Sequence, residues 1–212
     1  MFRTEGIEMA ERLRCELVSQ ETVYDLVYKL AEEIRASDYH PDLVVAISRG
    51  GFTPARVLCD VLGLFNLTSI RVVHYSKAAV HEQQAFVKYP LCMDVAGQRI
   101  LLVDDVNDTG DTLKIARSHL ESLGPTEVRI AVLHEKSCSP VRAEYVAESL
   151  DKWHWLIYPW AVVEDVGGFL LEMTPPSADS DQAADWLLNT YGLRLPEDQL
   201  SHLLSLIRKR VE

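Results

Sequence analysis

Apolar residues follow two patterns along this chain. In some stretches they are consecutive, and in others they recur every three or four positions. Consecutive branched side chains suit strands buried in a parallel sheet, whereas the wider spacing suits amphipathic helices. Runs of the first kind predict strands over residues 43–47, 70–75, 100–103 and 128–133. Runs of the second kind predict helices over residues 19–36, over about 53–62 and from 112 onward. The alternation predicts an α/β fold with a mainly parallel sheet.

Two stretches depart from both patterns. Residues 76–98 are polar and have no clean period, which predicts a long irregular loop. Residues 174–181 are rich in Pro, Ser and Asp, which is typical of a linker. Helical spacing resumes after it, so we expect a main domain over residues 1–175 and a C-terminal helical extension over residues 176–212. The extension is expected to pack on the core or to form the interface of a homodimer or higher homo-oligomer.

Composition narrows the class of protein. With 212 residues, 48% of them hydrophobic, the chain is long enough to bury a core and fits a single large domain. A net charge of −11 and a pI near 5.1 argue against nucleic acid as a partner. Apolar runs are too short for a membrane span, and the four cysteines are widely spaced, so we expect a cytoplasmic protein with reduced thiols and no membrane partner.

The densest candidate chemistry follows the predicted strand over residues 100–103. The sequence there is ILLVDDVNDTGDT, in which an apolar strand runs into a polar loop and then a helix. The carboxyl end of such a strand faces the ligand crevice of an open α/β sheet, and a helix start presents free N–H groups to an anion. The polar groups delivered there are Asp104, Asp105, Asp108, Thr109, Gly110 and Thr112. Acids beside an anion site indicate a sugar phosphate bound with Mg²⁺.

A similar loop follows the predicted strand over residues 43–47 and is called the first loop, because it comes earlier in the chain; the loop after residues 100–103 is called the second loop. Ser48-Arg49-Gly50-Gly51 leads directly into a helix. Glycine lets backbone amides approach a phosphate closely, and a guanidinium can pair with two of its oxygens. Taken alone, this sequence also suits a plain strand-to-helix turn.

Together these motifs resemble the type I phosphoribosyltransferase family, over roughly residues 20–165. The resemblance implies a doubly wound sheet with a small hood region over residues 76–98. It implies that Asp108, Thr109, Gly110, Asp111 and Thr112 hold the ribose 5-phosphate. It also implies that Asp104 and Asp105 hold the ribose hydroxyls and the metal, and that Asp108 accepts a proton near N7 of a 6-oxopurine.

The same resemblance assigns the first loop. Arg49, Gly50 and Gly51 match the loop that binds the diphosphate, and the Ser48–Arg49 bond is the candidate for a non-proline cis peptide. The hood would close over the diphosphate, with phosphate contacts drawn from His74, Tyr75, Ser76, Lys77, His81 and Lys88.

Three further residues match the base site of 6-oxopurine members. Lys136 follows the predicted strand over residues 128–133 and would donate to O6, although an exposed Lys is also common. Trp155 would stack on the purine, with the carbonyl of Leu156 at the base edge. Trp153 and Trp160 are interpreted as packing residues of a strand. Ala161 stands where many relatives carry an acid, with Glu164 three residues on, which leaves the base preference open.

The implied activity is transfer of the 5-phosphoribosyl group from phosphoribosyl diphosphate to N9 of a 6-oxopurine base, with release of pyrophosphate. The resemblance implies Asp108, Asp104 and Asp105 as the catalytic residues and Mg²⁺ as the cofactor. Another nucleobase, such as adenine or orotate, is the first alternative. A regulator that senses phosphoribosyl diphosphate without catalysis is the second, since a fold does not fix a function. The chain contains no G-x-x-x-x-G-K-[ST] motif, which disfavours a nucleoside triphosphatase.

Overall fold

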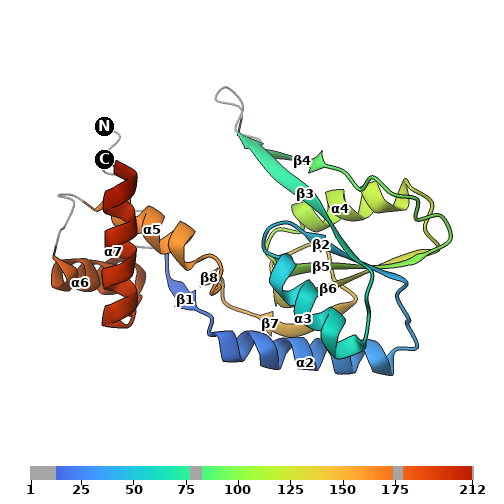
Figure 1. Cartoon of the computed structure of the whole chain (residues 1–212), viewed down its shortest axis with the longest axis horizontal. Helices are drawn as coiled ribbons and strands as arrows, with labels where there is room; N and C mark the ends of the chain where they lie inside the picture. The colour runs from blue at the N-terminus through green and yellow to red at the C-terminus, as the bar shows by residue number, and fades with distance from the viewer. Residues whose placement is uncertain (1–12, 77–82, 174–178, 212) are drawn as a thin grey trace. The chain divides into compact units, whose positions relative to one another are not determined.

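The structure is a computed structural model that describes residues 13–76, 83–173 and 179–211 (Figure 1). Its elements are β1 (Cys15–Leu17), α2 (Gln20–Ala36), β2 (Leu43–Ile47), α3 (Phe52–Leu62), β3 (Leu67–Ser76), β4 (Gln83–Tyr89), β5 (Arg99–Asn107), α4 (Asp111–Glu121), β6 (Glu127–Lys136), β7 (Tyr145–Leu150), β8 (Trp155–Ile157), α5 (Val162–Glu172), α6 (Ser180–Tyr191) and α7 (Glu197–Val211).

These elements form two compact units. The central unit is Glu21–Trp153, and the terminal unit combines Met1–Gln20 with His154–Glu212. These units do not coincide with the predicted domains, residues 1–175 and 176–212. A boundary between compact units can differ from a boundary between domains, so the predicted division stays a prediction.

The central unit is built on a six-stranded sheet in the order β4-β3-β2-β5-β6-β7. β2, β3, β5, β6 and β7 pair in parallel, and β4 is antiparallel to β3. All five residues of β2 are buried, as are the apolar residues at positions 100–103 of β5. Figure 1 shows α4 on one side of the sheet and α2 and α3 on the other. The predicted α/β fold with a doubly wound sheet is confirmed.

The chain leaves β2 in one direction across the sheet and β5 in the other. β2 leads through α3 to β3, and β5 leads through α4 to β6, while β2 and β5 are themselves neighbours. In open α/β sheets this change of direction opens a crevice at the carboxyl ends of the two strands. Both candidate loops begin at those ends.

Some elements differ from their prediction. β5 extends past Val103 to Asn107, because its backbone continues to pair with β6 beyond the apolar run. The stretch expected to be an irregular loop contains a strand, β4, whose Ala85 and Val87 pack on the core while Phe86 is exposed. β1, β7 and α5 were not predicted.

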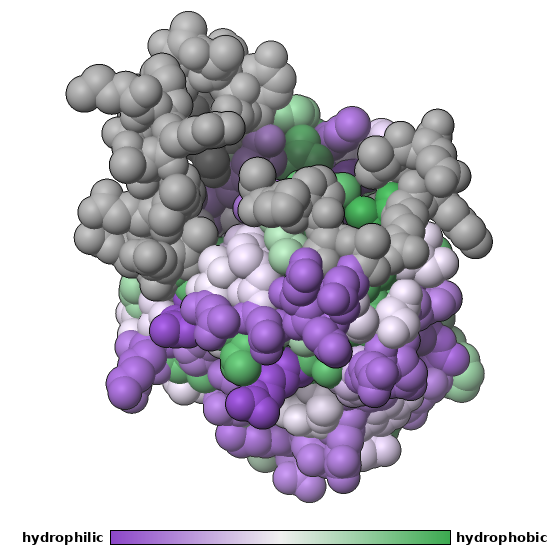
Figure 2. Space-filling model, turned by 90° about the vertical axis from the view of Figure 1, so that its left-hand side faces the viewer, coloured by the Kyte–Doolittle hydropathy of each residue, from purple (hydrophilic) through white to green (hydrophobic). Residues whose placement is uncertain are grey.

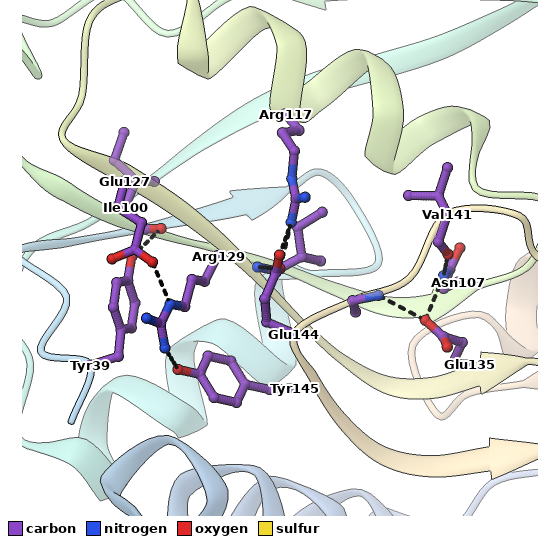
Figure 3. A network of polar contacts seen from close by, with 12 residues as sticks. Tyr39, Ile100, Asn107, Arg117, Glu127, Arg129, Glu135, Val141, Glu144 and Tyr145 are labelled. Carbon is purple, nitrogen blue, oxygen red and sulfur yellow. Dashed lines mark hydrogen bonds and ion pairs between the residues drawn. The ribbon is translucent and has the colours of Figure 1, made fainter. Parts of the chain in front are cut away.

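Polar contacts stabilise the end of the sheet opposite the crevice, where the parallel strands begin (Figure 3). The hydroxyl of Tyr39 donates to the carbonyl of Ile100 at 2.6 Å, and the Arg129 guanidinium lies 4.4 Å from the Tyr39 ring centroid. Arg129 also donates to the Tyr145 hydroxyl at 2.8 Å and pairs with Glu127. These contacts join the segment after α2 to β5, β6 and β7.

The terminal unit contains a two-stranded parallel sheet, β1 with β8, and the helices α5, α6 and α7. The helical spacing predicted after the linker is confirmed by α6 and α7. Asp179 caps α6 by accepting the N–H of Asp181 at 2.9 Å, and Gly192 ends it with φ 75°. The apolar faces of the three helices form one core, which includes Val166, Leu170, Leu187, Leu200 and Leu203.

The surface agrees with the composition. On the face shown in Figure 2, hydrophilic residues prevail among those coloured, and hydrophobic residues form small separate spots. None of the helices in the described part of the chain combines the length and apolar character that crossing a membrane requires. All four cysteines are unpaired thiols.

Candidate active site

The first loop occupies the turn between β2 and α3. Gly51 donates its N–H to the carbonyl of Ile47 at 2.9 Å and is the last residue before α3, whose start has no side-chain cap. The peptide bond between Ser48 and Arg49 is cis, as predicted. The loop therefore leaves backbone N–H groups at a helix start, where an anion is favoured.

The acid pair lies directly against this loop. A Cβ atom added to Gly50 would overlap the carboxylate of Asp105, so the backbone of the first loop and the end of β5 are in close approach. Glycine is required at position 50 for that reason. The two candidate loops, 56 positions apart at Arg49 and Asp105 by number, are thus brought together by the pairing of β2 with β5.

Asp104 is the buried member of the acid pair, with 8% of its surface exposed. Burial and the neighbouring Asp105 carboxylate raise its pKa well above the usual 3.8. Its Oδ1 accepts the N–H of Asp105 at 3.0 Å. A bound cation would offset both causes of the shift, and Mg²⁺ commonly takes one or two carboxylates together with phosphate oxygens. The donor chemistry of the pair therefore fits a hard divalent cation.

Asp104→Asn is expected to raise the free energy of unfolding of the ligand-free protein by about 0.5–2 kcal/mol at pH 7. Because the folded-state pKa lies above the unfolded value, the ionised carboxyl destabilises the fold above pH 3.8, and the gain from asparagine should grow as the pH rises from that value. Urea unfolding from pH 4 to pH 8 measures this gain.

The matched control for that experiment is Asp25→Asn, which changes an exposed acid on α2. It should alter the free energy of unfolding by no more than about 0.5 kcal/mol at any pH. An Asp104 variant that is destabilised at pH 7, or whose gain shrinks as the pH rises, would contradict the account of its buried charge.

The second loop joins β5 to α4 through residues 108–110. Gly110 is the residue before α4 and has φ 82°, a conformation that side chains other than glycine rarely adopt. A Cβ atom there would also lie 2.7 Å from Cβ of Val141. The Thr109 hydroxyl donates to Asp111 at 3.0 Å, and no side chain caps the helix. This loop too leaves helix N–H groups open to an anion.

One of the residues expected to contact phosphate lies beside the start of α4, directly after the second loop. His74, on β3, has its Nε2 atom 3.1 Å from the Thr112 hydroxyl. Among the other hood candidates, Lys88 is exposed on β4, with Nζ 5.6 Å from the ring centroid of Tyr89. Lys77 and His81 lie outside the described residues. His74 is the hood candidate that the described contacts place beside the loop.

A buried polar network supports the second loop from behind (Figure 3). Asn107 is 1% exposed, and its Nδ2 donates to Glu135 at 2.8 Å and to the carbonyl of Val141 at 2.7 Å. The Ser139 hydroxyl donates to Oδ1 of Asn107 at 3.0 Å. The network fixes the end of β5 against the segment that follows β6, and so fixes the start of the loop.

Glu135 is the anionic centre of this network. Burial alone would raise its pKa, but the hydrogen bonds from Ala143, Arg142 and Asn107 outweigh burial and lower the pKa. Glu135 therefore stays ionised in the fold. Neither Asn107 nor Glu135 was predicted to matter, because nothing in their local sequence reveals that they face each other across β5 and β6.

Lys136 and Asp108 meet at the carboxyl ends of β6 and β5. Lys136 is 3% exposed, and its Nζ lies 3.1 Å from Oδ2 of Asp108. The alternative that Lys136 is a solvated surface cation is thus wrong. A donor and an acceptor stand side by side at this end of the sheet, next to the loop of residues 108–112.

Trp153 joins this pair. Its Nε1–H donates to Oδ1 of Asp108 at 3.0 Å, and Lys136 Nζ lies 4.4 Å from its ring centroid. The interpretation of Trp153 as a packing residue of a strand is wrong, because it lies between β7 and β8 and is 49% exposed. Trp160 packs, stacked on Tyr158 with ring centroids 5.0 Å apart, but it follows β8 and does not belong to a strand.

Trp155 and Leu156 belong to β8 in the terminal unit. The N–H of Trp155 donates to the carbonyl of Arg14 at 2.8 Å, and its indole donates to Asp165 at 3.0 Å. Leu156 pairs with Glu16 of β1. Burial, followed by a smaller effect of Glu164, raises the pKa of Asp165, although the Trp155 hydrogen bond lowers it. The roles of Trp155 and Leu156 toward a base stay predictions.

The fold and the site define an α/β protein in which two strand-to-helix loops, both suited to an anion, lie at the carboxyl ends of neighbouring strands with a pair of carboxylates beside them. The phosphoribosyl transferase domain family matches residues 16–164 of the chain. The chain belongs to this family, so it is a phosphoribosyltransferase with the type I fold.

Three named proteins illustrate the similarity. Hypoxanthine-guanine phosphoribosyltransferase of Saccharomyces cerevisiae is 29% identical over 68% of this chain and 84% of its own. Xanthine-guanine phosphoribosyltransferase of Gluconobacter oxydans is 30% identical over 55% of this chain and 67% of its own. The crystal structure of purine phosphoribosyltransferase from Pyrococcus horikoshii has a TM-score of 0.63 and 30% identity, covering 69% of this chain and 93% of its own.

Proposed function

We propose that the protein transfers the 5-phosphoribosyl group from phosphoribosyl diphosphate to N9 of a 6-oxopurine and releases pyrophosphate, with Mg²⁺ as cofactor. The observation that carries the proposal is the contact of Lys136 with Asp108. A 6-oxopurine presents an acceptor, O6, next to N7, and a buried ammonium beside a carboxylate matches that edge. The same substrate class is supported by the relatives whose names include hypoxanthine, guanine or xanthine.

The two loops divide the work of binding phosphoribosyl diphosphate. Arg49, Gly50 and Gly51 bind the diphosphate through the guanidinium and backbone amides. Residues 108–112 bind the 5-phosphate through the amides at the start of α4 and through the hydroxyls of Thr109 and Thr112. The close approach of Gly50 to Asp105 supports this division, since it sets the two loops on either side of the acid pair.

The acid pair acts on the ribose. Asp104 and Asp105 hold its hydroxyls and place negative charge near the anomeric carbon, which becomes positive in the transition state. The same carboxylates would hold Mg²⁺, and the ion neutralises the leaving diphosphate when bound. Asp108 accepts the proton that leaves the base, while Lys136 donates to O6.

The base choice also depends on the residues around Trp155. By resemblance, Trp155 stacks on the purine ring and the carbonyl of Leu156 meets the edge at C2. Guanine offers an amino donor there, which an acceptor with nearby carboxylates, Glu164 and Asp165, favours over the partly anionic xanthine. We therefore expect hypoxanthine and guanine to be used ahead of xanthine.

The test is pyrophosphate release by the purified protein with phosphoribosyl diphosphate and each of hypoxanthine, guanine, xanthine, adenine and orotate, with and without Mg²⁺. Turnover of 6-oxopurines that disappears when Mg²⁺ is chelated is the expected result. Turnover of adenine or orotate alone would show that the substrate is that base and not a 6-oxopurine. Binding of phosphoribosyl diphosphate with no turnover of any base would indicate a non-catalytic sensor.

Arg49→Ala is expected to weaken binding of phosphoribosyl diphosphate and of pyrophosphate by about 10- to 100-fold, the loss of a charged hydrogen-bonding partner. Affinity for a nucleoside monophosphate should change little, because its 5-phosphate binds the other loop. Calorimetric titration of the three ligands measures this split.

Arg56→Ala is the control, since Arg56 is exposed on α3 and pairs with Asp60 of the same helix. It should leave all three affinities within about twofold. Equal losses for the three ligands in Arg49→Ala would contradict the division between the loops.

We also propose that the enzyme works in the cytoplasm as a homodimer or higher homo-oligomer. Analytical ultracentrifugation of the full chain tests the assembly, and a monomer at micromolar concentration with full activity would refute it.

A further inference from the structure

Trp153 makes contact with both groups that are assigned to the base edge. Its indole N–H donates to Oδ1 of Asp108, and the ammonium of Lys136 lies over its ring. Lys136 itself occupies the other oxygen, Oδ2. Each carboxylate oxygen of Asp108 therefore has a donor, and the ammonium of Lys136 lies over an aromatic ring.

The indole has the chemistry of the ligand that it adjoins. Like a purine, it is a fused bicyclic aromatic with an N–H in its five-membered ring, and that N–H is directed at the carboxylate proposed to accept a proton near N7. A base that uses Asp108 and Lys136 together would need the oxygen and the ammonium face that Trp153 now contacts. Indole and base are competitors for the same groups.

We propose that Trp153 occupies the place of the N7–O6 edge of the base in the ligand-free protein and is displaced when the base binds. This inference rests on the proposed function of Asp108 and Lys136. The location of Trp153 suits such a movement, because it belongs to neither β7 nor β8 and its side chain is 49% exposed. Few packing contacts oppose the displacement of a half-exposed side chain.

The size of the effect follows from the contacts that are lost. One hydrogen bond and one partly exposed cation–π contact together favour the occupied state by about 5- to 30-fold. The apparent affinity for the base falls by the fraction of molecules whose site is open. Removing the competitor should therefore lower KM for the base and leave the other kinetic constants nearly unchanged.

Two substitutions separate the two contacts. Trp153→Phe removes the N–H donor but keeps a ring over Lys136, and Trp153→Leu removes both. With hypoxanthine and saturating phosphoribosyl diphosphate, we expect KM for the base to fall by about 3-fold in the Phe variant and by about 10-fold in the Leu variant. In both, kcat and KM for phosphoribosyl diphosphate should stay within about twofold.

The matched control is Trp186→Phe, which changes a half-buried tryptophan of α6 that packs edge-on against Tyr191. Its kinetic constants should equal those of the wild type. If kcat falls in the Trp153 variants while KM for the base stays constant or rises, Trp153 is a structural support of Asp108 and the inference is overturned.

Tryptophan emission gives a second measurement that does not need the Leu variant to fold. Because Trp155 is itself proposed to stack on the purine, the emission is followed in Trp155→Phe. Titration of this variant with inosine monophosphate should change the emission as the indole of Trp153 leaves Lys136 and Asp108. Adding Trp153→Phe should remove most of that change, whereas adding Trp186→Phe should keep it. An equal change in all three proteins would refute the displacement. A wild type that turns over no base at all would instead refute the proposed function, and this inference with it.

Discussion

Asp108→Asn is expected to lower kcat by about 10²- to 10⁴-fold, the usual contribution of a positioned general base. The amide has nearly the same shape as the carboxylate, so the second loop should keep its conformation. It cannot take a proton from the base. Binding of phosphoribosyl diphosphate should therefore change by no more than a few-fold, and steady-state kinetics with a separate binding titration will show the split.

Asp25→Asn, an exposed change on α2, serves as the control and should retain full kcat. The proton-acceptor role is wrong if Asp108→Asn turns over purines within a few-fold of the wild type. A parallel loss of turnover and of phosphoribosyl diphosphate binding would instead show that the loop itself had been disturbed.

The second large effect concerns the choice between oxo and amino groups at C6. Lys136 is a donor without an acceptor, is buried, and already pairs with Asp108. An amino group placed opposite it would leave two donors unpaired. The wild type should therefore prefer hypoxanthine over adenine in kcat/KM by a large factor, up to about 10⁴.

Lys136→Gln sharpens this test, because an amide side chain both donates and accepts. It should slow hypoxanthine turnover and narrow the preference over adenine, as measured by competition between the two bases. Lys114→Gln, on α4, is the control and should keep the wild-type preference. Adenine turnover equal to that of hypoxanthine in the wild type would refute both the role of Lys136 and the 6-oxopurine assignment.

The buried strands and both loops were predictable because their signals are local. Five consecutive buried residues form β2, and the run before Asp104 forms the middle of β5. Each run is followed at once by polar residues and a helical period. A parallel strand must bury both faces, so the sequence pattern carries that constraint within a few residues.

Strands with weaker patterns were not predictable in the same way. β4 has one face on the core and one exposed, in a stretch that is largely polar, and it is held by pairing with β3. β7 follows the segment that the Asn107 and Glu135 network fixes, and only its first half alternates, between buried and partly buried residues. Pairing with a distant strand outweighs such weak local preferences.

The sequence by itself determined the chemistry of this protein: which groups end the strands, which loops open a helix to an anion, and which fold can carry them. Tertiary structure alone decided which of those groups meet. It set Gly50 against Asp105, buried Lys136 beside Asp108, and brought Trp153 onto both, because contacts across a sheet depend on strand order and register. Neither order nor register is encoded in the residues that surround each group along the chain.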